Sequence, residues 1–349
     1  MTDSAQSVVA RILAEQGVEG AIAPLAREAF LAREASVRAW IASGAHGTME
    51  WLANTVEPRV APWTAWPWAQ SFLVVKLPYG LPLPGVRGSH PEIAGYARGR
   101  DYHYRMEGIL KRIQAELEKA FEGLQSFRFC DDQHLPEVEL AVQAGLGWRG
   151  RNTLLLTRGG SAFHLGGLLL SLRVPSAPPA HRDHCGTCTA CVDACPTQAL
   201  TPDGRIDARL CLSHWNIEDR ATSPGEAARA SKGEVYGCDL CQQACPWNRR
   251  AMVENTLPAT WPVSWEQWVD LCRPGAGFQS LFTKTPLRRS GRHKTLKVLL
   301  RNLWNVDHGK AQELSRQVLE TETHAPLRDW IEATLAWHGQ AAPLETDRP

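Results

Sequence analysis

The chain has 349 residues, which is enough for two or three domains with cores of their own. Hydrophobic residues make up 44% and charged residues 21% of the sequence, which is the balance of a globular protein. A formal net charge of +1 means that a polyanionic partner would have to meet a local basic patch. The longest apolar run, 165–174, is interrupted by glycines and is too short to span a bilayer.

Helices and one strand are predicted in the first part of the chain. Apolar residues recur at helical spacing within the first 55 residues, so that region is expected to be helical. A loop with several prolines carries Arg59, and the apolar run 71–76 after it predicts a buried strand. The prolines and glycines of 78–85 indicate an irregular loop, a kind of segment that often carries site residues.

An amphipathic helix is predicted over 106–121, where apolar residues mark one face. The segment before it, 96–103, reads Tyr-Ala-Arg-Gly-Arg-Asp-Tyr-His. This segment either caps the helix, with Asp101 near the N-terminus, or belongs to a ligand site, because it holds more tyrosine, arginine and histidine than a cap requires. A short strand is expected at 126–129.

A helix around Leu140, a glycine-rich turn over 144–152 and two strands, 153–157 and 163–174, are predicted next. The Gly159-Gly160 dipeptide between the strands is a hairpin signal. The glycine-rich turn follows a helix and contains no G-x-G-x-x-G, so it is neither a Walker loop nor a dinucleotide fingerprint. Its glycines allow a sharp turn or a close approach to a neighbour, which is either a cofactor or a strand.

The cysteines of the central region form two runs with the spacing of iron–sulfur ligands. The first run reads C-x-x-C-x-x-C-x-x-x-C-P, the bacterial ferredoxin pattern for a [4Fe-4S] cluster, and a shorter copy follows it. In two-cluster ferredoxins the last cysteine of a run binds the other cluster. We therefore assign one cluster to Cys185, Cys188, Cys191 and Cys245, and the other to Cys195, Cys211, Cys238 and Cys241.

Structural zinc and disulfides are the alternatives for these cysteines. Zinc sites are built from paired C-x-x-C units, but they require neither a third cysteine at the next interval nor a proline after the last ligand. The first residues, M-T-D-S-A-Q-S, lack the basic and apolar regions of an export signal, so we expect a reducing compartment and no disulfides. Cys130 and Cys272 lie outside the pattern and are expected to be small buried residues.

The chain after the cysteines is predicted to be helical and locally basic. A proline-rich linker, 175–179, leads into the cysteine region, and apolar residues return at helical spacing over 296–304. Between 284 and 301 there are basic residues and no acidic ones, namely Lys284, Arg288, Arg289, Arg292, Lys294, Lys297 and Arg301. Such a face is either simply solvated or in contact with phosphates. The last residues, 339–349, are expected to form a flexible tail.

Two adjacent [4Fe-4S] clusters conduct electrons and therefore imply an acceptor. About the first 180 residues are available to hold that acceptor, a length sufficient for a separate domain. An electron-transfer module without a pocket of its own is the competing interpretation, and the size of the N-terminal region argues against it.

Four motifs resemble those of the epoxyqueuosine reductases. They are Y-A-R-G-R-D-Y-H at 96–103, A-G-L-G-W-R-G-R-N-T at 144–153, H-C-G-T-C-T-A-C-V-D-A-C-P-T-Q-A-L at 184–200 and Y-G-C-D-L-C-Q-Q-A-C-P-W-N at 236–248. The resemblance extends from about 41 to 286. It implies a cobalamin-dependent iron–sulfur reductase, related to reductive dehalogenases, that converts epoxyqueuosine to queuosine at the wobble position of tRNA.

The resemblance also implies roles for individual residues. The proton donor would be Asp131, thirteen residues before the A-G-L-G-W segment, and such a general acid must carry its proton when it acts. Cobalamin would be held without a protein ligand to cobalt and would receive electrons from the clusters. Its contacts would come from Arg59, Tyr96, Asp131, Arg151 and Leu155. The tRNA backbone would contact Arg288, Arg289, Arg292 and Lys294.

The sequence departs from the family pattern at two places in the expected pocket. The family continues its aspartate as D-S-A-P or D-T-G-P, whereas this chain has Asp131-Asp132-Gln133-His134. The family has L-G-E where this chain has Leu-Gly-Gly at 165–167, so a carboxylate is missing. Asp132 or His134 could share the acid role, and a corrinoid iron–sulfur reductase acting on a small molecule is the alternative function.

Together these observations predict an α+β protein that is a cytoplasmic monomer. Its parts would be a cobalamin- and substrate-binding α/β domain with a nitroreductase-like sheet over 1–177, a ferredoxin-like domain with two [4Fe-4S] clusters over 178–250, a HEAT-like helical region over 251–338 and a tail over 339–349. Its partners would be tRNA bearing epoxyqueuosine and an external flavodoxin- or ferredoxin-like electron donor, with no membrane involved.

Overall fold

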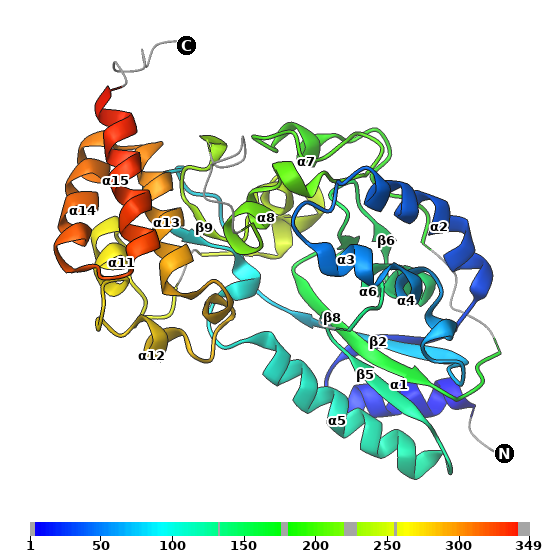
Figure 1. Ribbon diagram of the computed structural model, residues 1–349. Helices are drawn as coiled ribbons and strands as arrows, with labels where there is room; N and C mark the ends of the chain where they lie inside the picture. The colour runs from blue at the N-terminus through cyan, green and yellow to red at the C-terminus, as the bar shows by residue number, and fades with distance from the viewer. Residues whose placement is uncertain (1–3, 132, 176–180, 220–228, 255–256, 341–349) are drawn as a thin grey trace. The chain divides into compact units, whose positions relative to one another are not determined.

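The computed structural model describes residues 4–131, 133–175, 181–219, 229–254 and 257–340 (Figure 1). The chain divides into two compact units that alternate along the sequence. The first unit contains residues 1–84, 95–211 and 239–256, and the second contains 85–94, 212–238 and 257–349. The domains predicted from the sequence are instead each one continuous stretch of the chain, and their boundaries remain a prediction. Residues 176–179 of the expected linker and 341–349 of the expected tail lie outside the described residues.

The first unit combines helices of very different lengths with a four-stranded sheet. Its α-helices are α1 (Ala5–Glu15), α2 (Arg27–Ala42), α3 (Glu50–Asn54), α4 (Val56–Val60), α5 (Tyr102–Ala120), α6 (Glu137–Gln143), α7 (Ala190–Asp193) and α10 (Leu240–Gln243). Its strands are β1 (Glu19–Pro24), β2 (Ser71–Pro78), β3 (Leu81–Pro82), β5 (Ser126–Phe129), β6 (Trp148–Arg149), β7 (Leu155–Leu156), β8 (Phe163–Leu170) and β10 (Met252–Val253). Single 3-10 turns lie at Pro62–Thr64, Gly95–Ala97, Ala208–Leu210 and Pro246–Arg250.

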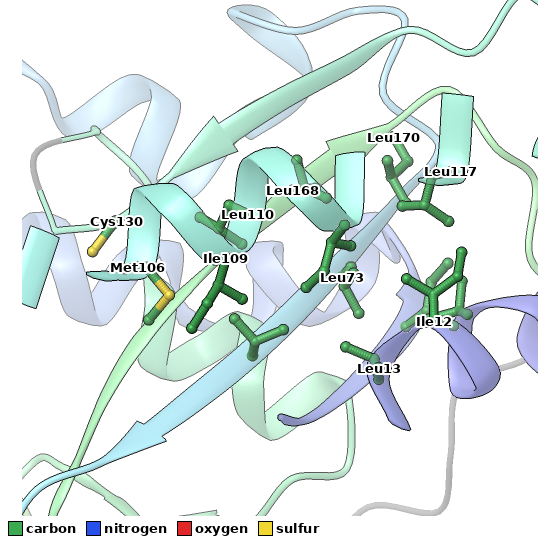
Figure 2. Packing of buried hydrophobic residues seen from close by; sticks show 14 of the residues in the cluster. Ile12, Leu13, Leu73, Met106, Ile109, Leu110, Leu117, Cys130, Leu168 and Leu170 are labelled. Carbon is green, nitrogen blue, oxygen red and sulfur yellow. The ribbon is translucent and has the colours of Figure 1, made fainter. Parts of the chain in front are cut away.

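The main sheet has the order β1-β2-β8-β5, and all neighbouring strands are antiparallel. Side chains of a strand alternate between its two faces, and β2 shows this clearly. Leu73 and Val75 pack in one core with α1 and α5, whereas Phe72 and Val74 pack in another with α2 and α6. The sheet is therefore covered by helices on both faces, and Figure 2 shows the core formed with α1 and α5.

The second unit is mostly helical. Its α-helices are α8 (Leu212–Ile217), α11 (Trp265–Leu271), α12 (Phe278–Phe282), α13 (Gly291–Trp304), α14 (His308–Thr321) and α15 (Ala325–Gln340), with a 3-10 turn at Pro286–Arg289 and the paired strands β4 (Glu92–Ile93) and β9 (Glu234–Tyr236). The Trp268 indole stacks on Phe282 with the ring centroids 5.5 Å apart. Helix α15 extends two residues into the stretch expected to be a tail.

Several predicted elements are confirmed and others are corrected. The strands expected at 71–76 and 126–129, the helix over 106–121 and the helix over 296–304 are present. The prediction of helices alone in the first 55 residues was wrong, because β1 pairs with β2 there. Arg59 lies in α4 instead of a loop.

The strands predicted around Gly159-Gly160 are shorter than expected and do not form a hairpin. β7 is reduced to two residues because Thr153 has a left-handed backbone with φ of 68°, which strand geometry does not allow. β7 pairs with β6, whereas β8 pairs with β2 and β5. The two glycines instead close a tight turn in which the Thr157 and Gly160 backbones bond to each other.

In this structure position 167 has no room for the carboxylate side chain of the family pattern. A Cβ atom added to Gly167 would lie 2.0 Å from the Leu73 carbonyl oxygen of β2 and 2.6 Å from the Phe129 ring. The backbone oxygen cannot move without breaking the sheet, so this position accepts only glycine. Among the described residues, no helix has the length and apolar character that a membrane span requires.

Candidate active site and iron–sulfur region

Asp131 follows directly after β5 and Cys130. Its φ of 60° lies in the left-handed region, which aspartate tolerates better than most residues. The Tyr102 hydroxyl donates a hydrogen bond of 2.5 Å to Asp131 Oδ2, and the Asp131 backbone N–H donates one of 2.5 Å to Glu137 Oε1. The carboxyl group is thus held at a fixed place although its side chain is 61% exposed. Asp132, the alternative acid, lies outside the described residues, and His134 is exposed.

The segment 96–103 both caps α5 and reaches Asp131. Asp101 is the N-cap residue, and its carboxylate accepts a hydrogen bond of 3.1 Å from the His103 backbone. The same carboxylate oxygen lies 2.8 Å from His103 Nδ1, and His103 Nε2 lies 3.8 Å from Asp131 Oδ2. The cap interpretation is therefore confirmed, while Tyr102 and His103 in the first turn of the helix approach the predicted acid.

Arg59 and Asp131 line the same pocket of about 290 Å³. The Arg59 guanidinium lies over the Trp51 ring, 5.2 Å from its centroid, and Arg59 Nε is 3.4 Å from the Thr55 hydroxyl. Burial lowers the pKa of Arg59, and the charges of Glu137 and Asp131 oppose that shift. The fold thus brings together two of the predicted cofactor residues that are far apart in the sequence.

Tyr96 lines a second pocket, of about 610 Å³, together with Tyr102 and His164. The His164 ring stacks on Tyr102 with centroids 4.0 Å apart, and His164 Nε2 is 3.2 Å from the Tyr96 carbonyl oxygen. Burial lowers the pKa of His164 to about 4, so the ring is neutral near pH 7. The sequence analysis missed His164, although one polar side chain in the apolar strand β8 was a signal.

Arg151 lines a third pocket, of about 590 Å³, and its guanidinium donates to the carbonyl oxygens of Pro202 and Gly186. Arg33, Val37 and Arg149 line both this pocket and the Asp131 pocket. Leu155 instead packs in the core on the α2 and α6 side of the sheet. The predicted cofactor residues thus fall in three pockets, two of which share lining residues, and in one core position of the same unit.

The first predicted set of cluster cysteines gathers in the first unit. Burial raises the pKa of the Cys191 thiol, and the nearby Cys245, Cys185 and Cys188 raise it further. The Cys245 thiol responds in the same way to burial and to Cys185 and Cys188. Trp148 packs against this group, with Trp247 5.2 Å and His184 4.7 Å away between ring centroids.

Three cysteines of the second set also lie together. Desolvation raises the pKa of the Cys241 thiol, and the nearby Cys211, Asp239, Cys191 and Cys195 raise it further. The Cys195 sulfur accepts a hydrogen bond of 3.3 Å from the Ala199 backbone. Cys238 belongs to the second unit.

The surroundings of the cysteines decide how a cofactor could bind them. Four thiols so close together repel one another when ionised, and a cationic iron–sulfur core would offset that repulsion. As placed, no group of three or more His, Cys, Asp or Glu side chains within the described ranges could hold a metal ion. Cys130 and Cys272 are buried, as expected for residues outside the ligand sets.

The basic residues of 284–301 differ in their surroundings within the second unit. Arg288 and Arg289 are exposed in the 3-10 turn before α13. Arg292 instead pairs with the enclosed carboxylate of Glu322 at 2.5 Å, and it lowers the pKa of that carboxyl to about 2. Lys294 donates to the carbonyl oxygens of Trp215 and Asp219, and Arg301 is buried.

Comparison with known proteins agrees with this arrangement. The model of a family described as "4Fe-4S double cluster binding domain" matches residues 184–248, and the model described as "Epoxyqueuosine reductase QueG, DUF1730" matches residues 59–132. An epoxyqueuosine reductase of Xanthomonas campestris pv. campestris is 35% identical over 332 residues, which cover 88% of this chain and 89% of that protein.

Two solved structures share the fold. The epoxyqueuosine reductase of Streptococcus thermophilus matches with a TM-score of 0.77 at 23% identity, covering 97% of this chain and 94% of that chain. An epoxyqueuosine reductase solved with an epoxyqueuosine-modified tRNA-Tyr stem loop matches with a TM-score of 0.72 at 20% identity, covering 95% of this chain and 97% of that chain. The mixed α/β architecture is therefore that of these enzymes.

The sheet-containing unit and the double-cluster domain define an iron–sulfur oxidoreductase. More particularly, the extended likeness to the Xanthomonas enzyme shows that the chain belongs to the epoxyqueuosine reductase family.

Removing Cys245 should disturb the cysteine group that it shares with the first run. In Cys245→Ala, iron content after anaerobic reconstitution is expected to fall from about eight to about four atoms per chain, because a cubane needs four thiolates. Iron and sulfide analysis with electron paramagnetic resonance measures the loss. Cys272→Ala is the matched control, since this buried cysteine lies outside both sets. Full iron content in Cys245→Ala would contradict the assignment.

Proposed function

We propose that this chain reduces epoxyqueuosine in tRNA to queuosine, with electrons passing through two [4Fe-4S] clusters to cobalamin and Asp131 as the proton donor. The reaction replaces an epoxide by a carbon–carbon double bond, consumes two electrons and two protons, and releases the oxygen as water. The observation that carries the proposal is the Asp131 carboxyl, held by Tyr102 in a pocket with Arg59, in the unit that also gathers the cysteines. Membership of the reductase family supports it.

The clusters would be ligated as the sequence spacing indicates. Cys185, Cys188, Cys191 and Cys245 would hold one cluster, and their mutual proximity supports that set. Cys195, Cys211, Cys238 and Cys241 would hold the other, supported by the proximity of Cys241 to Cys195 and Cys211. A small external redox protein would reduce the clusters.

The pockets around Asp131 suit a corrinoid. They are of the size of ligand sites, and their walls combine apolar side chains with arginine and tyrosine donors for the amide oxygens of a corrin. Arg59, Tyr96 and Arg151 would hold the cofactor, and Leu155 would support it from the core. Cobalamin, when bound, supplies a reducible cobalt centre for attack on the epoxide.

Asp131 would protonate the oxygen that leaves the epoxide carbon. Giving up the proton turns the acid into a carboxylate, and the Tyr102 hydroxyl, which already donates to Oδ2, stabilises that anion. The backbone bond to Glu137 keeps the residue in its left-handed conformation. Hydrogen bonds to both its side chain and its backbone thus orient Asp131.

The tRNA would contact the second unit through phosphate groups. Arg288 and Arg289 are exposed and fit that role, and a structural relative was solved with a tRNA stem loop. Arg292 and Lys294 hold internal partners, so their contribution would be to support the turn and α13.

The activity is tested in tRNA from a strain that lacks the gene. Epoxyqueuosine should accumulate, and a plasmid copy of the chain should restore queuosine, as measured by mass spectrometry of digested tRNA. Unchanged queuosine in the deletion strain contradicts the tRNA assignment and favours a small-molecule substrate.

Asp131→Asn should retain cobalamin but lose turnover. Because positioned general acids contribute about a hundred- to ten-thousand-fold, kcat is expected to fall by about a hundred-fold or more. Conversion of epoxyqueuosine in reconstituted enzyme measures this, with Asp329→Asn on the exposed side of α15 as the control. Turnover near the wild-type rate with cobalamin bound would place the donor elsewhere, with Asp132 as the next residue to test.

Replacing Arg288 and Arg289 by alanine should weaken tRNA binding without changing the fold. Because each arginine that meets a phosphate releases about one counterion, each replacement should lower the slope of log affinity against log salt by about one. Fluorescence titration at several salt concentrations measures this, and Lys111→Ala with Lys119→Ala on the exposed face of α5 is a control of equal charge. An unchanged slope would remove these arginines from the interface.

A further inference from the structure

Arg149, at the end of β6, is a half-buried cation that has no direct partner among the described residues. Its side chain lines both the Asp131 pocket and the 590 Å³ pocket of Arg151. No described residue forms a hydrogen bond or an ion pair with its guanidinium. A guanidinium in the wall of two pockets that has no protein partner is available to bind a ligand of opposite charge, and its partial burial makes the unpaired state less favourable.

The neighbouring charges do not neutralise Arg149. The carboxylate that acts on it, Glu139, already pairs with Arg33, whose Nη1 lies 2.7 Å from Glu139 Oε2 at an angle outside hydrogen-bond geometry. Burial, with the charge of Arg33, lowers the pKa of Arg149 to about 10, while Glu139 opposes the shift. The guanidinium therefore stays charged at pH 7. Arg33, Glu139 and Arg149 together carry one net positive charge.

The other charged side chains that line the two pockets all have partners. Among the acids, Asp131 accepts from Tyr102, Glu137 from the Asp131 backbone, Asp183 from the Cys185 backbone, and Asp203 from Thr201 while pairing with Arg205. Among the bases, Arg59 lies over Trp51 and Arg151 donates to carbonyl oxygens. Among the described charged residues that line these two pockets, Arg149 is thus the one without a direct hydrogen bond or ion pair.

The chemistry of the ligand follows from the geometry of the group. A guanidinium fork binds the oxygens of a phosphate in pairs. This inference rests on the proposed function, because cobalamin carries a single anionic group, the phosphodiester that joins its corrin to its nucleotide base, while its other side arms are neutral amides. We propose that Arg149, assisted by Arg33, binds the phosphodiester of cobalamin.

The arrangement gives the two pockets different tasks. Arg59 and Asp131 line the smaller one, where the reaction would take place. Arg149 stands in the wall that this pocket shares with the larger one, so it would anchor the cofactor through its phosphate, away from the proton donor. Arg149 would then select complete cobalamins over corrinoids that lack the nucleotide strap.

The test is a binding cycle on the full-length protein with reconstituted clusters. Wild type and Arg149→Met are titrated with cobalamin, with cobinamide phosphate, which lacks the base, and with cobinamide, which lacks base and phosphate. Loss of a charged hydrogen-bonding pair should weaken the first two about ten- to a hundred-fold. Cobinamide affinity should change less than about threefold, because it has no anion for Arg149 to bind. Arg205→Met, which lines the larger pocket but pairs with Asp203, should behave as wild type.

Stability and tRNA binding separate the remaining outcomes. The melting temperature of the cobalamin-free protein should not fall in Arg149→Met, because the change removes a half-buried charge that has no partner and keeps an apolar side chain of similar length. Equal weakening of all three corrinoids would overturn the proposal. So would unchanged corrinoid binding with weakened binding of a tRNA stem loop, which would make the phosphate that of RNA. Wild type that binds no corrinoid ends both the proposal and the cofactor assignment, whereas phosphate-dependent corrinoid binding without epoxyqueuosine turnover would leave the proposal standing and refute the function.

Discussion

The contact between Met106 and Gly166 sets the height of helix α5 above the sheet, and the candidate active site depends on that height. A Cβ atom on Gly166 would lie 2.7 Å from Met106 Cγ, so the helix could not approach β8 so closely if this strand residue were larger. The apolar face of α5 then fills one core of the first unit, as Figure 2 shows. Because interiors are tightly packed, an added atom there would force the Met106 side chain out of its place between α5 and β8.

The packing of α5 also fixes the position of its first turn, which contacts the predicted proton donor Asp131. Tyr102 and His103 begin the helix, and Asp131 lies just beyond β5, which pairs with β8. The 2.5 Å bond from Tyr102 to Asp131 thus joins two segments that are separately anchored on the same strand. A carboxyl on a short left-handed segment needs such an external support, because its own backbone conformation is not the most stable one.

Regular patterns in the sequence predicted the long elements, and tertiary contacts decided the rest. The sequence predicted β2 from its run of apolar residues and α5 from the helical spacing of its apolar residues. β1 was missed because Glu19–Pro24 is short, rich in small residues, and defined mainly by its pairing with β2 about fifty residues later. Asp131 came from a family motif, and its environment could not be read locally, because Tyr102 and Arg59 reach it from other elements. The cysteine ligands could be predicted without such context, since their spacing within a short stretch of sequence is itself the signature of the cluster.

The interleaving of the two units limits how the protein can be synthesised and divided. The first unit contains β3 near residue 81 and its partner β10 near residue 252, and Cys245 joins a group that begins at Cys185. At ordinary translation rates β3 waits roughly ten to thirty seconds for its partner to be made. During that time pieces of the second unit have already emerged without the helices that later cover them. No single cut of the chain yields two intact units, so gene fusion or shortening cannot exchange the electron-carrying part as a separate module.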